Sequence, residues 1–81
     1  MTEDELREVY NILVECWKDY KAFSKIVGKT TEDSLTDWDD YIHSIEARTR
    51  KHGNDHFQRQ LDKLFMADLE RRALERMEKN Q

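Results

Sequence analysis

Two histidines at metal-ligand spacing are the first residues that could carry chemistry. His52 and His56 are four positions apart, and on one continuous helix this spacing places two ligands on the same face. The residues between them, 53–55, read Gly-Asn-Asp, which favours a helix break. We therefore expect these two side chains to lie on different elements and not to share a metal ion.

A carboxylate and a histidine at the spacing used in di-iron bundles form a second candidate. Asp40 and His43 stand three residues apart. Di-iron sites need a second such pair and further glutamates that face the bundle interior. His43 lies off the apolar stripe of its segment, so the sequence predicts no metal site.

Cys16 is the one residue with a nucleophilic thiol. Its position on an apolar stripe predicts a buried thiol with a raised pKa, which is a poor nucleophile. The chain has no glycine-rich phosphate loop, and paired carboxylates need a pocket that a small helical bundle rarely provides. We therefore expect no enzymatic activity and no cofactor.

The elements that must position these residues are three helices. Charged residues make up 40% of the 81, with no proline and two glycines, a composition typical of long solvent-facing helices. Gly28 and Gly53 predict helix ends, and Thr2 followed by Glu5 predicts a capping box at the first start. The sequence predicts one all-α domain, residues 1–81, an up-down-up antiparallel bundle with helices at about 3–27, 32–52 and 55–78.

Apolar residues recur at helical spacing in all three segments, so each helix has a predicted core face. The face of the first helix has heptad spacing and consists of Leu6, Val9, Leu13, Cys16, Tyr20, Phe23 and Val27. The face of the second consists of Leu35, Trp38, Ile42 and Ile45, and its C-terminal end should be weakly buried. The face of the third consists of Phe57, Leu61, Leu64 and Phe65.

The third segment carries a second apolar stripe. Met66, Leu69, Ala73 and Met77 cluster about 135° away from the predicted core face when residues advance by 100°. Either the helix bends or rotates so that these side chains reach the other two helices, or the stripe pairs with a second copy in a homodimer. Methionine suits such an adaptable contact surface.

Residues 29–46 hold six carboxylates against one lysine, a local net charge of −5. Acidic residues near helix starts complement the helix dipole, which is one explanation. The other is a dock for a basic groove on a protein partner. The candidate dock consists of Asp37, Trp38, Asp39, Asp40 and Tyr41.

Basic residues gather around the second turn, which makes a DNA-binding regulator the alternative function. The candidate nucleic-acid residues are Arg48, Arg50, Lys51, Gln58, Arg59 and Lys63. A net charge of −4 and a pI of about 5.3 argue against it, because phosphate-binding domains usually carry excess positive charge. Nucleic acid is therefore not the expected partner.

Four features together resemble uncharacterised small helical proteins of bacterial phages and mobile elements. These features are the T-x-x-E start, the aromatic-rich first helix, the stretch Asp37 to Tyr41 and the helix end Glu70-Arg71-Arg72. The resemblance implies an accessory protein, a regulator or an inhibitor of a host system, that acts by binding a protein. A single cysteine and the lack of a signal peptide or an apolar span predict a cytoplasmic location without membrane contact.

Overall fold

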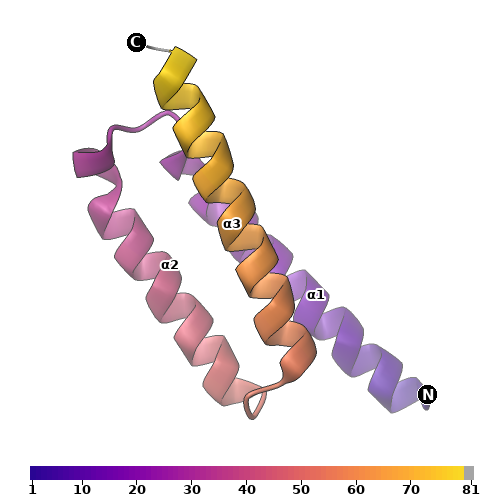
Figure 1. Ribbon diagram of the computed structural model, residues 1–81. Coiled ribbons are helices and arrows are strands. Elements are labelled where there is room, and N and C mark those ends of the chain that lie inside the picture. The colour runs from indigo at the N-terminus through magenta and orange to yellow at the C-terminus, as the bar shows by residue number, and fades with distance from the viewer. Residues whose placement is uncertain (80–81) are drawn as a thin grey trace.

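Three helices and one short 3-10 turn make up the computed structural model, which describes residues 1–79. The helices are α1 (Glu3–Phe23), α2 (Thr31–Lys51) and α3 (His56–Lys79), and the turn η1 spans Ser24–Ile26. Helix α2 runs opposite to α1 and α3 (Figure 1), and each helix contacts the other two. The predicted all-α three-helix bundle is confirmed.

The helix starts follow the capping residues in the sequence. The Thr2 hydroxyl accepts from the Glu5 amide at 3.1 Å, and the Glu5 carboxylate accepts from the Thr2 amide at 3.0 Å. The Thr30 hydroxyl accepts from the Asp33 amide at the start of α2, and Asp55 accepts from the Gln58 amide at the start of α3. Each helix therefore begins within a few residues of its predicted start.

The first helix ends earlier than the predicted residue 27. Helix α1 stops at Phe23, and residues 24–26 form the 3-10 turn η1. The Ser24 hydroxyl donates to the Lys21 carbonyl at 2.6 Å, a local bond that competes with continuation of the helix. The tighter turn buries Ile26, and Gly28 follows with a φ of 101°.

The buried face of α2 differs from the predicted one. Ser34, Asp37, Tyr41 and Arg48 are buried, whereas Leu35 and Ile42 of the predicted core stripe are exposed. The buried face is thus offset by about one residue from the apolar stripe. The expected weak burial of the C-terminal end is also wrong, because Arg48 is only 6% exposed. Ion pairs to α1 and α3 hold Arg48 inside.

Helix α3 buries one straight face, and not the two surfaces that its apolar residues suggest. Gln58, Asp62 and Leu69 are buried on this face, whereas the predicted core residues Phe57 and Leu64 are exposed. The prediction fails because it draws the core face from apolar residues alone and so leaves out Gln58 and Asp62. Of the rest of the predicted second stripe, Met66 lies between Asp62 and Leu69 along this face, and Ala73 and Met77 continue it toward the C-terminus. All three are partly buried.

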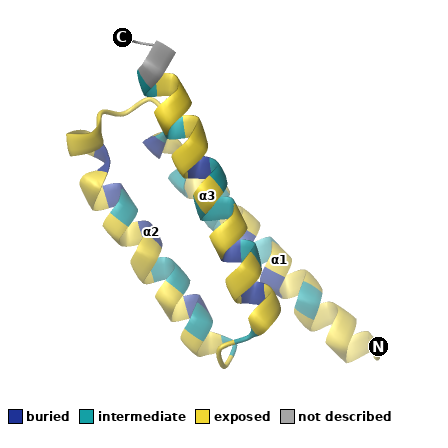
Figure 2. Cartoon of the chain, viewed as in Figure 1, coloured by how far each residue is buried: buried dark blue, intermediate teal, exposed yellow. Residues whose placement is uncertain are grey.

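The core is small and extends as a narrow strip from Ile26 at the η1 end of the bundle to Gln58 at the start of α3. On α1 only Ile12 and Cys16 are buried, while Leu6 and Leu13 of the predicted core stripe are exposed. The N-terminal part of α1 is coloured mostly as exposed (Figure 2). The molecule measures 51 × 20 × 17 Å. Its radius of gyration is 14.4 Å, and a compact chain of this length would have about 12 Å.

Within the described residues, no helix is long and apolar enough to cross a membrane.

Candidate protein-binding site

The residues of the predicted acidic dock do not form one surface. Tyr41 is 0% exposed and Asp37 is buried, so neither side chain is available to a partner. Asp37 instead forms an ion pair with Lys29 at 2.6 Å. Trp38 is half-buried, and Asp39 and Asp40 are exposed. The predicted dock is therefore wrong as one surface, and Trp38 with the side chains beside it remains as the candidate contact.

Trp38 lines an apolar groove of about 360 Å³ between α2 and α3. Ile42 continues the α2 wall, and the α3 wall contains the methionines of the predicted second stripe. Ile26, Lys29 and Thr31 close the end near η1. The complete lining consists of Ile26, Lys29, Thr31, Ser34, Trp38, Ile42, Met66, Glu70, Ala73, Leu74 and Met77.

The candidate self-association stripe is divided between the groove and the core. Met66, Ala73 and Met77 line the groove, whereas Leu69 is only 1% exposed. Leu69 is thus a core residue that packs within its own chain, and its prediction as a self-association residue is wrong. The stripe had two interpretations, packing against the other two helices or pairing with a second copy. The position of Leu69 agrees with the first.

Among the described residues that line the groove, the charged side chain without an ion-pair partner is acidic. Glu70 lines it directly, while Lys29 is already paired with Asp37. Helical periodicity places Asp39 and Glu46 along the outer edge of the α2 wall, next to Leu35. Asp40 falls on the opposite side of α2, toward α1. The two adjacent carboxylates of the predicted dock therefore belong to different surfaces.

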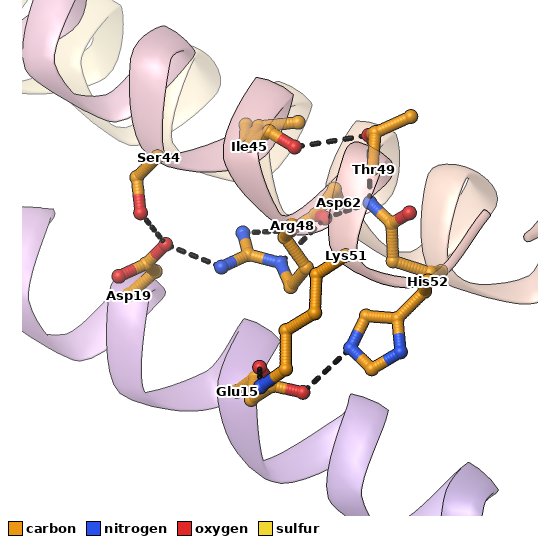
Figure 3. Close-up of polar contacts among 10 residues, drawn as sticks. Glu15, Asp19, Ser44, Ile45, Arg48, Thr49, Lys51, His52 and Asp62 are labelled. Carbon is orange, nitrogen blue, oxygen red and sulfur yellow. Dashed lines mark hydrogen bonds and ion pairs between the residues drawn. The ribbon is translucent and has the colours of Figure 1, made fainter. Parts of the chain in front are cut away.

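A buried polar cluster joins the three helices on the inside (Figure 3). Arg48 of α2 donates to Asp62 of α3 through Nη2 at 2.6 Å and Nε at 2.9 Å. Its Nη1 donates to Asp19 of α1 at 2.5 Å. The carboxylates satisfy the guanidinium and raise the pKa of Arg48 above its ordinary value, although burial alone would lower it. In the sequence Arg48 belongs to the predicted basic surface, and no pattern singles out Asp19 or Asp62.

Neighbouring polar side chains complete the cluster. Gln58 Nε2 donates to Asp62 at 2.6 Å and to the Thr49 hydroxyl at 3.2 Å, and the Ser44 hydroxyl donates to Asp19. Asp62 is 1% exposed, so a substrate has no access to this carboxylate. The arrangement links all three helices through one hydrogen-bonded network.

The hydroxyl of Tyr41 lies close to the same cluster. Burial raises its pKa well above the ordinary value, and the negative charge of Asp62 raises it further. Among the described residues, neither this hydroxyl nor Gln58 Oε1 has a hydrogen-bond partner. Tyr41 therefore stays neutral, and its ring serves packing by stacking on Phe23 at 4.9 Å.

The histidines lie apart from one another. His52 is the residue that follows α2 and caps its C-terminus, where its Nε2 is 2.7 Å from Glu15 Oε2, and His56 begins α3. The residues between them turn the chain, and both Gly53 and Asn54 have positive φ. Within the part of the chain that the structure describes, no group of three or more His, Cys, Asp or Glu side chains could hold a metal ion.

The candidate nucleic-acid residues do not form a continuous basic surface. Arg48 and Gln58 are buried, and Lys51 pairs with Glu15 at 2.7 Å. The other three candidates, Arg50, Arg59 and Lys63, are exposed. The predicted basic surface is thus interrupted by residues that are buried in the core or paired with another helix.

Comparisons with protein-family models, with curated proteins and with solved structures find no match for this chain.

Acidification should destabilise the fold through Asp68. The Tyr20 hydroxyl donates to this carboxylate at 2.5 Å, and with Arg72 and Arg71 it holds the pKa of Asp68 well below its ordinary value. A lowered pKa in the fold gives stability that is present above the ordinary pKa of Asp, about 4, and is lost as the pH falls below it. We expect the melting temperature to fall from pH 6 to pH 3, with a shallower fall in Asp68→Asn.

Calorimetry across this pH range measures both slopes. Asp39→Asn is the control, because this carboxylate is exposed, and it should follow the wild-type curve. Equal slopes for Asp68→Asn and the wild type would show that the Tyr20 contact contributes nothing to the pH dependence.

Proposed function

We propose that this chain is a protein-binding module that receives an amphipathic helix in the groove between α2 and α3. The observation that carries the proposal is the apolar wall formed by Trp38, Ile42, Met66 and Leu74. Ile42 and Leu74 expose 41% and 60% of their surface to water, which a bound apolar face would remove. Helix-in-groove binding is a recurring mode of recognition that uses such surfaces.

The charges beside the groove favour a partner helix with basic flanks. Glu70 on one wall, with Asp39 and Glu46 along the edge of the other, are positioned to meet Lys or Arg side chains. Methionines on the α3 wall allow the groove to adapt to different apolar side chains. An accessory protein that acts by binding, as the resemblance to phage and mobile-element proteins implies, would work in this way.

A model peptide tests the groove directly. In a Trp17→Phe background Trp38 is the one tryptophan, so its fluorescence reports occupancy of the groove. An 18-residue amphipathic helix, about 27 Å long, with leucine on one face and lysine on the other should change this fluorescence saturably. The affinity should fall with added salt, and the same peptide with glutamate in place of lysine should bind at least tenfold more weakly.

Matched variants locate the site. Asp39→Lys should weaken binding of the lysine peptide several-fold, whereas Asp40→Lys, the same change on the adjacent residue, should leave it unchanged. Leu74→Glu should abolish binding because it places a charge on the groove wall. Equal effects of the two aspartate variants, or equal binding of both peptides, would refute the proposal.

A further inference from the structure

A second apolar surface lies on the α1 and α3 helices, on the side away from α2. Ten large hydrophobic side chains are exposed in the described part of the chain, and six of them belong to this surface. They are Leu6, Tyr10, Leu13, Trp17, Phe57 and Leu64. We call these six residues the α1–α3 face.

Contacts within the bundle show why these residues share one side. Tyr20 of α1 lies 5.0 Å from the ring of Phe65 and donates to Asp68, so these residues mark the seam between α1 and α3. Asp19 of α1 turns the other way, toward Arg48 of α2. Periodicity of about 100° per residue then places the four α1 residues of the face just beyond the seam, on the side opposite to α2.

The exposed residues of α3 also lie on the side away from α2. Asp62 points toward Arg48 of α2, and Phe65 points toward α1. Phe57 and Leu64 lie beyond Phe65, again away from α2. Because α1 and α3 run in the same direction side by side (Figure 1), their two exposed stripes border one seam and form a continuous surface.

The α1 stripe is complementary to itself when reversed. Along one flank the order is Glu3, Leu6, Tyr10, Leu13, Trp17 and Lys21, all exposed. In an antiparallel pair, Leu6 meets Trp17 of the other copy, Tyr10 meets Leu13, and Glu3 meets Lys21. A parallel pair would place like charges together at both ends, which is unfavourable.

We propose that the partner of the α1–α3 face is a second copy of this chain, bound with the two α1 helices antiparallel. Six roughly half-exposed side chains of this size remove about 600 Å² per copy from water, close to the 800 Å² per partner of a standard interface. A two-fold axis makes each contact occur twice, as an isologous dimer requires. This surface is separate from the α2–α3 groove, so the dimer can exist whether or not the groove binds a helix.

Sedimentation equilibrium of matched variants tests the dimer. Leu64 and Leu74 are both leucines of α3 with 65% and 60% exposure, but only Leu64 belongs to the α1–α3 face. The wild type should have the mass of two chains at high micromolar concentration, and Leu64→Glu should raise the dissociation constant at least tenfold. Leu74→Glu should dimerise like the wild type. A wild-type monomer, or equal effects of the two variants, would overturn the proposal.

Charge reversal tests the antiparallel orientation. Glu3→Lys or Lys21→Glu alone places like charges opposite each other and should weaken the dimer several-fold. The double variant exchanges the two charges and should restore the wild-type dissociation constant. Failure of the double variant to recover, with helix content by circular dichroism unchanged, would exclude this orientation. Leu64→Glu should still bind the lysine peptide, so the peptide assay tests the groove proposal independently of the dimer.

Discussion

Replacing Arg48 by methionine is expected to cost about 3–5 kcal/mol of stability, because it leaves buried carboxylates without their partner. Methionine fills much of the same space, so the loss reports the charge and not a cavity. Asp62 would lose two hydrogen bonds from the guanidinium while staying almost fully buried, and Asp19 would lose one.

This loss is comparable to the total stability of the domain. A chain of 81 residues is expected to have a free energy of unfolding of about 4–12 kcal/mol. Few apolar side chains are fully buried in this structure, which suggests a value toward the lower end. Urea unfolding followed by circular dichroism should therefore show a large fall in the midpoint, or a variant already partly unfolded without urea.

Two further variants make the result specific to the buried pair. Arg50→Met introduces the same side chain two residues away, at an exposed position, and should change the free energy of unfolding by less than about 0.5 kcal/mol. Combining Arg48→Met with Asp62→Leu removes the deeper charge as well and should recover part of the loss. Equal stabilities of the Arg48 and Arg50 variants would show that the cluster is not what holds the helices together.

The helices could be predicted because local chemistry determines where they begin and end. Thr2 with Glu5 supplies a complete capping box, and both glycines adopt the positive φ that closes a helix. The exception is the end of α1, where a single hydroxyl of Ser24 favours a tighter turn. Such a competition between a side chain and the helix is too small to read from periodicity.

The buried faces of α2 and α3 could not be predicted because their central residues are polar. Arg48, Gln58 and Asp62 read as solvent-facing residues unless their partners are known. Arg48 has its partners 14 and 29 residues away on other helices, and Gln58 bonds to Thr49 of α2 as well as to Asp62 of its own helix. Leaving these three residues out of the core face rotated the predicted core of both helices. The one local signal was that Asp62 shares a helical face with Gln58 and Leu69.

The sequence indicated residues of both groove walls, but it did not indicate that they form one site. Sequence patterns singled out Trp38 as part of a partner dock and Met66, Ala73 and Met77 as part of a dimer surface. The structure places all four on facing walls. Sequence periodicity describes one helix at a time, so it could not show that two incomplete surfaces belong together.

Cys16 should be at least about a thousand times less reactive in the folded chain than in the unfolded one. Burial raises the pKa of this thiol from an ordinary value of 9.0 to about 12, with a further contribution from the negative charge of Asp62. The thiolate is the reactive form, so at pH 8 its fraction falls from about one in ten to about one in ten thousand. The thiol is also 0% exposed, which keeps reagents from reaching it.

A disulfide reagent that releases a coloured thiolate measures this rate at pH 8, with and without urea. An exposed cysteine in the double variant Cys16→Ala/Ala47→Cys serves as the control and should react at the rate of an unfolded chain. A Cys16 rate within tenfold of this control would contradict the buried position of the thiol.

The thiol then becomes a probe of the neighbouring ion pair. Because Cys16 reacts only when the core opens, its labelling rate follows the population of the open state whenever closing is faster than labelling. The loss of about 3–5 kcal/mol expected for Arg48→Met corresponds to labelling that is roughly 100 to 5,000 times faster. An unchanged labelling rate in this variant would show that the core opens without breaking the contacts of Arg48, and that the ion pair and the apolar core are separate units of stability.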